Sequence, residues 1–97
     1  MNQEMDYDES VYFRFVYAAN IMVVSKKTLP LRLHDALFAF ILPIREDELP
    51  IRYQDKCKTL VDSISKYISV EEAEGLARLL IHVKDDMASE YHRSLSN

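Results

Sequence analysis

The histidines are the first residues to consider for metal or catalytic chemistry. His82 precedes Asp86 by four residues, and Glu90 follows a turn later, whereas His34 and His92 belong to other stretches. Residues four apart share one face of a helix. A histidine and a carboxylate on such a face supply two ligands, but a structural zinc ion requires four. We interpret this group as an exposed helix face and expect no metal and no cofactor.

Cys57 is the only cysteine, so an internal disulfide framework and a cysteine-based zinc site are excluded. A nucleophilic cysteine needs a lowered pKa and a nearby base. Cys57 falls on an apolar stripe, and its neighbours Lys56 and Lys58 point elsewhere on a helix. We therefore expect a buried structural thiol. Together with the absence of a signal peptide, the single cysteine favours a cytoplasmic protein.

Neighbouring carboxylates perform acid–base chemistry only where a cleft raises the pKa of one of them. The three candidate groups all lie in polar stretches that we expect to be solvated. They are Glu46-Asp47-Glu48, Glu71-Glu72 and Asp85-Asp86. No serine, histidine and aspartate are spaced as a catalytic set. The sequence therefore predicts no enzyme.

Nucleic-acid binding is disfavoured by a net charge of −4 and a pI near 5.3, because phosphate contacts require a basic surface. A helix-turn-helix is conceivable from the second and third expected helices. Its recognition helix would carry four cations, but two acids interrupt them. These residues are Arg52, Lys56, Lys58 and Lys66, interrupted by Asp55 and Asp62. We interpret them as a mixed solvated face. No apolar run approaches the ~20 residues of a membrane span.

Acidic residues cluster without interleaved cations at two places. The first is the N-terminal tail, with Glu4, Asp6, Asp8 and Glu9, and the second is Glu46, Asp47 and Glu48, which Arg45 precedes. Like-signed clusters steer oppositely charged proteins. We predict that Glu46, Asp47, Glu48, Asp6, Asp8 and Glu9 contact a basic partner protein, although ordinary solubility explains the same residues.

The elements that position these groups are expected to be helices, because one glycine and three prolines are too few for a β-rich or nucleotide-binding fold. The sequence predicts an all-α, single-domain, four-helix bundle-like fold with short connections over residues 1–97. The expected parts are an acidic tail over 1–8, helices over 10–24, 28–42, 50–68 and 69–91, and a frayed end over 94–97. In the first helix, Ser10, Arg14 and Ser25 form a polar stripe that also contains Ala18.

The stretch Ala36–Leu42 is apolar at every position, so we expect the rest of the chain to cover it. Leu37, Phe38 and Phe40 are predicted to be core, and Phe40→Ala to cost about 3–5 kcal/mol. The first two helices are expected to supply most of the core.

The third and fourth helices carry clearer patterns. The third has apolar residues at one-faced helical spacing, namely Tyr53, Cys57, Leu60, Val61, Ile64, Tyr67 and Ile68. Ser69 with Glu72 forms a capping box at the start of the fourth. The core stripe of the fourth is Ala73, Leu76, Ala77, Leu80, Val83, Met87 and Tyr91, flanked by Leu79 and Ile81. Gly75 either permits a close helix approach or is merely tolerated.

A small acidic helical protein without an evident active site typically acts by binding. Our first hypothesis is an inhibitor or immunity protein, of the antitoxin type, that covers the working surface of a basic nuclease or toxin. The alternative is a homo-oligomeric helical regulator or adaptor, with DNA binding as one version. The first, second and fourth helices together also carry more apolar surface than one small core hides, so we expect a homodimer.

Overall fold

The computed structural model describes residues 9–96, and all of their regular structure is helical. The four principal helices are α1 (Glu9–Val24), α2 (Leu29–Ala36), α3 (Ile51–Asp62) and α4 (Val70–Ser96). Shorter segments join them: the π-helical turn η2 (Leu37–Ile41) and the 3-10 turns η3 (Glu46–Glu48) and η4 (Ser63–Ser65). The predicted all-helical, four-helix fold is confirmed. The predicted tail over residues 1–8 lies outside the described residues.

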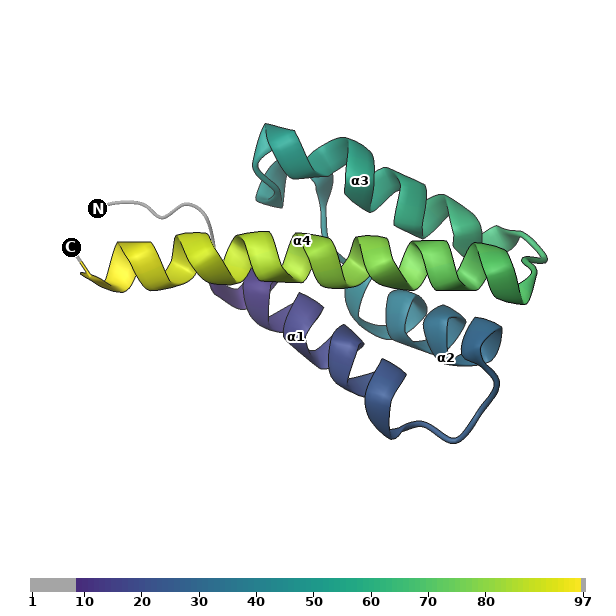
Figure 1. Cartoon of the computed structure of the whole chain (residues 1–97). Helices are drawn as coiled ribbons and strands as arrows, with labels where there is room; N and C mark the ends of the chain where they lie inside the picture. The colour runs from purple at the N-terminus through teal and green to yellow at the C-terminus, as the bar shows by residue number, and fades with distance from the viewer. Residues whose placement is uncertain (1–8, 97) are drawn as a thin grey trace.

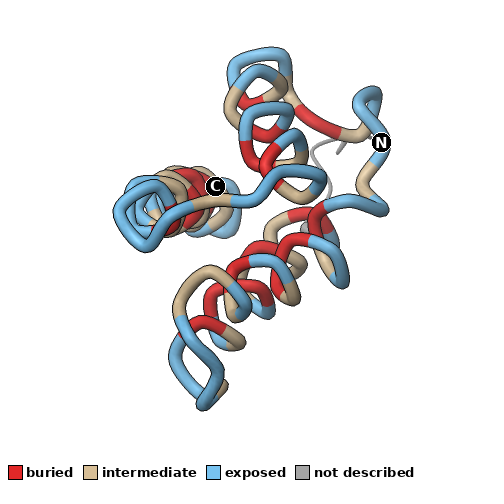
Figure 2. The backbone as a smooth tube through the Cα atoms, turned by 90° about the vertical axis from the view of Figure 1, so that its right-hand side faces the viewer, coloured by how far each residue is buried: buried red, intermediate tan, exposed pale blue. Residues whose placement is uncertain are grey.

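α4 is the common partner of the other three helices (Figure 1). Figure 2 looks along α4 and shows α3 on one side of it and the layer of α1 and α2 on another. The core lies between these layers and receives buried side chains from all four helices. They include Val11, Phe15, Ala18 and Met22 from α1, Leu33 and Ala36 from α2, Leu37 and Ile41 from η2, Tyr53, Cys57 and Leu60 from α3, and Ala73, Leu80, Val83 and Met87 from α4.

The connection between α1 and α2 is held by two cations. The Nη1 of Arg32 donates to the carbonyl oxygen of Met22 at 2.7 Å, which satisfies one of the carbonyls that a helix C-terminus leaves free. The Nζ of Lys27 lies 2.7 Å from Oδ2 of Asp35. The hydrogen bond from Lys27 holds the pKa of Asp35 below its ordinary value of 3.8. Thr28 precedes α2 as its N-cap residue, but its side chain makes no capping hydrogen bond.

The prediction that Ala36–Leu42 is fully covered is wrong. Phe38, predicted to be core, is 56% exposed, and Ala39 and Leu42 are also exposed. The reason is a wide turn, in which the N–H of Leu42 donates to the carbonyl of Leu37 at 2.8 Å, five residues back. Leu37 and Ile41 therefore both point inward, as predicted for Leu37, while Phe40 is partly buried against the core.

The third helix is shorter than predicted and the fourth is longer. α3 ends at Asp62 and the chain turns through η4, so Tyr67, predicted on the apolar stripe, is fully exposed. α4 continues past Tyr91 to Ser96.

Two small residues also had open roles in the sequence. Ala18, placed on the polar stripe of α1, is buried. A Cβ on Gly75 would meet nothing within 4 Å, so no helix approaches closely there and the glycine is simply tolerated.

The capping box at the start of α4 is confirmed. The N–H of Glu72 donates to Oγ of Ser69 at 3.1 Å, and the N–H of Ser69 donates to Oε1 of Glu72 at 2.9 Å. We expect Ser69→Ala to lower the free energy of unfolding by about 1 kcal/mol, because an N–H of the first turn loses its acceptor. Thr28→Ala is the matched control, since Thr28 also precedes a helix but makes no such bond. Urea denaturation measures both, and equal losses would contradict the assignment.

Candidate protein-interaction surfaces

Within residues 9–96, the histidine and carboxylates considered as metal ligands do not assemble into a metal site. Nε2 of His82 lies 3.5 Å from Oδ2 of Asp86, and both side chains are exposed. Glu90 instead pairs with Arg52 of α3. Over residues 9–96, no three histidine, cysteine or acidic side chains gather closely enough to hold a metal ion. Within the same residues, no helix has the length and hydropathy needed to cross a bilayer.

Cys57 is buried, as predicted, with only 5% of its surface exposed. Burial raises the pKa of its thiol from 9.0 to about 11, because the thiolate would be desolvated. A nucleophile requires the opposite shift. Cys57 is therefore a packing residue of α3 with no features of a reactive thiol.

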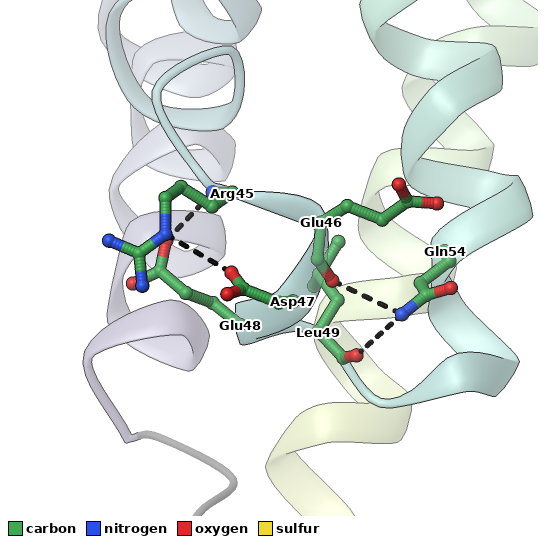
Figure 3. Close-up of polar contacts among 6 residues, drawn as sticks. All are labelled: Arg45, Glu46, Asp47, Glu48, Leu49 and Gln54. Atoms are coloured by element: carbon green, nitrogen blue, oxygen red, sulfur yellow. Dashed lines mark hydrogen bonds and ion pairs between the residues drawn. The ribbon is translucent and has the colours of Figure 1, made fainter.

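The acidic segment Glu46–Glu48 forms η3, immediately before α3 (Figure 3). Two of its three carboxylates are engaged locally. Oδ1 of Asp47 lies 3.1 Å from Nε of Arg45, and Oε1 of Glu48 accepts the N–H of Arg45 at 2.7 Å. The hydrogen bond between the side chains of Arg45 and Asp47 also raises the pKa of Arg45. The field of the segment is thus weaker than its three acids suggest.

Glu46 differs from its two neighbours because its carboxylate points away from Arg45 (Figure 3). The backbone of the segment is fixed to α3 by Gln54, whose Nε2 donates to the carbonyls of Glu46 and Leu49, at 3.1 Å each. Beside it lies a surface hollow of about 250 Å³. Its lining residues are Glu46, Leu49, Gln54, Cys57, Lys58 and Val61.

The predicted site residues therefore differ in their exposure to solvent. Glu46 and Asp47 are exposed and Glu48 is half-buried. Asp6 and Asp8 lie outside the described residues, and Glu9 is the first residue of α1. The apolar floor of the hollow was not predicted. The sequence signal was available, since Leu49 directly follows the acidic segment and Val61 belongs to the apolar stripe predicted for the third helix.

A second surface is the outward side of α1, which we call the α1 face. It consists of Phe13, Val16, Tyr17, Asn20, Val23 and Val24, all exposed except the half-buried Val16. None of the six is charged. The polar stripe expected from the sequence lies only partly on the exposed side of α1: Ser10 is exposed, Arg14 and Ser25 are half-buried and Ala18 is buried.

Aromatic contacts extend the α1 face onto its neighbours. The Phe13 ring lies 5.8 Å from that of Tyr91 on α4, and the Tyr17 ring lies 5.7 Å from that of Phe40 on η2. Phe13 and Tyr17 are four residues apart and adjacent on the helix surface. A row of aromatic side chains thus crosses three elements. Monomeric soluble proteins rarely leave large contiguous apolar surfaces in water, so this face is a candidate interface.

Comparison with known proteins adds no assignment: no protein-family model, no curated protein and no solved structure matches the chain. Its function is therefore argued from these two surfaces.

Proposed function

We propose that this chain is a small inhibitor or immunity-type protein that binds a basic partner protein, such as a nuclease or toxin, and covers its working surface. The observation that carries the proposal is the position of Glu46, an exposed carboxylate beside an apolar hollow. Lysine and arginine have apolar stems and cationic heads. One such side chain of a partner would place its stem in the hollow and its head against Glu46.

The surroundings of the hollow support this proposal. Gln54 fixes the backbone on both sides of the acidic segment, so little conformational freedom is lost on binding. Lys58 also lines the hollow, and its like charge opposes a basic side chain. Glu46, which lines the same hollow, offsets that repulsion.

The runner-up is a homo-oligomeric helical regulator or adaptor. The α1 face favours it, because an uncharged apolar helix face serves assembly better than it serves recognition of a basic protein. The two functions use different surfaces, so an inhibitor that dimerises is compatible with both observations.

The test reverses the charges of the acidic segment. The double variant Glu46→Lys/Asp47→Lys should fold normally, because exposed charges contribute little to stability. We expect its association with the partner, identified by pull-down, to slow by at least about tenfold at low salt, since rim charges act mainly on the on-rate. The salt dependence of the association rate should weaken in parallel. Stopped-flow association at low and high salt measures both.

The matched control is Asp62→Lys/Glu74→Lys, which makes the same change in net charge at exposed positions of α3 and α4. It should retain most of the association rate. If both double variants slow association equally, net charge alone steers the partner and the acidic segment is not in the interface. Unchanged rates in the first variant at both salt concentrations would reject the proposed site.

A further inference from the structure

We propose that two copies of this chain pair through the α1 face, around a two-fold axis that passes close to Asn20. This interface uses other residues than the acidic segment, because the α1 face belongs to α1 and the acidic segment is η3. The inference therefore does not depend on the proposed function, and either can fail alone.

The spacing of the exposed residues matches a helix-pairing seam. Phe13, Tyr17, Asn20 and Val24 follow one another at intervals of four, three and four residues. This alternation keeps one line of side chains on one side of a helix and is the pattern by which two helices pack together. In α1 the seam faces away from the core, because Val11, Phe15, Ala18 and Met22 occupy the inner side. The seam thus has the form of a packing surface that is still exposed, although Phe13 and Tyr17 also contact rings of neighbouring elements along its edges.

Asn20 indicates that the partner helix is a second copy. A side-chain amide buried against an apolar surface would lose its hydrogen bonds to water, which is unfavourable unless a new partner replaces them. A second Asn20 brought near by a two-fold axis supplies both a donor and an acceptor. One asparagine in an otherwise apolar seam is also a known means of fixing register and the number of associated helices.

The charge distribution favours the same pairing. The chain has a net charge of −4, so two copies repel each other wherever their acidic surfaces meet. None of the six residues of the α1 face is charged, and its aromatic neighbours Tyr91 and Phe40 are also uncharged. Like charges placed opposite each other cost several kcal/mol. The α1 face is a surface on which two copies meet without that cost.

The size of the face indicates a weak dimer. A helix of the length of α1 is about 24 Å long and, with its side chains, about 10 Å wide. Widened by Phe40 and Tyr91, its footprint is on the order of 300–400 Å² per copy, below the roughly 800 Å² of a standard interface. We therefore expect a concentration-dependent equilibrium with a dissociation constant on the order of 10–100 µM.

Sedimentation equilibrium tests the pairing on the whole chain. The unmodified chain should fit a monomer–dimer equilibrium, and Val23→Glu and Asn20→Asp should each weaken it by at least about tenfold, because each places two like charges across the axis. Ile51→Glu is the control, since Ile51 is a comparably exposed apolar residue at the start of α3. It should dimerise like the unmodified chain. Circular dichroism verifies that each variant keeps its helix content.

Disulfide trapping tests where the axis lies. Two cysteines join only when their Cα atoms come within about 7 Å, and Cys57 is buried and should not compete. Asn20→Cys should form a covalent dimer at least about tenfold faster than Glu74→Cys, which is exposed on α4.

Three results would each overturn the proposal. The first is an unmodified chain that stays monomeric at several hundred micromolar, and the second is unchanged dimerisation of Val23→Glu and Asn20→Asp. The third is cross-linking of the two cysteine variants at equal rates.

Discussion

Phe15→Ala is expected to lower the free energy of unfolding by about 3–5 kcal/mol, the typical cost of removing a large side chain from a packed core. Phe15 projects from α1 into the core and has no exposed surface. The loss combines the transfer free energy of the ring with the cavity that the surrounding side chains cannot fill. Equilibrium denaturation in urea, followed by circular dichroism, measures it.

Phe38→Ala is the matched control, because the same atoms are removed from a side chain that is 56% exposed. It should cost less than about 1 kcal/mol, in the range of surface substitutions. Equal losses at the two positions would contradict the outward orientation of Phe38 that the wide turn at Leu37–Ile41 produces.

The second large effect is a loss of stability at high pH through Cys57. In the unfolded chain its thiol ionises near pH 9.0, whereas burial raises the pKa in the folded chain to about 11. Between these values the unfolded state binds fewer protons, so a rising pH favours unfolding. Below pH 9 both states keep the proton and this contribution to stability is fully present. At about 1.36 kcal/mol per pKa unit, the loss should reach about 2–3 kcal/mol.

Cys57→Ala isolates this contribution, because lysines and tyrosines also titrate in the same range. The difference in unfolding free energy between the unmodified chain and Cys57→Ala should be constant up to about pH 9 and should shrink by about 2–3 kcal/mol by pH 11. Guanidinium denaturation at a series of pH values provides the comparison. Parallel curves for the two proteins would show that the thiol of Cys57 is not desolvated in the fold.

Local chemistry explains why parts of the fold were predictable from the sequence. The Ser69–Glu72 capping box needs only residues three apart, and its two hydrogen bonds formed as predicted. The inward positions of Tyr53, Cys57 and Leu60 follow from helical spacing alone. Such features depend on neighbours in the sequence.

The errors arise where the backbone departs from a regular helix. The sequence predicts Phe38 in the core because Ala36–Leu42 has no polar residue to mark an outer side. The wide turn that directs Phe38 outward has no recognisable sequence signal. Tyr67 was assigned to α3 because its spacing continued the apolar stripe, although the helix ends at Asp62. The spacing of apolar residues predicts which side chains face the core only within the residues that form the helix.

The candidate surfaces were predictable only in part. The exposure of Glu46 and Asp47 follows from their charges, but the engagement of Asp47 by Arg45 depends on the η3 turn. The sequence predicts an excess of apolar surface on the first, second and fourth helices together. It does not place that excess on α1, where the expected polar stripe contains the half-buried Arg14 and the buried Ala18. The spacing of Phe13, Tyr17, Asn20 and Val24 was the available signal, and it was missed.

The central place of α4 has a consequence for synthesis on the ribosome. α1, α2 and α3 all pack against α4, which spans residues 70–96. A nascent chain emerging from its N-terminal end therefore exposes the apolar sides of three helices before their shared partner leaves the exit tunnel. Such surfaces attract chaperones and promote aggregation until they are covered. Among the four helices, α4 is thus the last to emerge and to join the fold, and the other three wait for it.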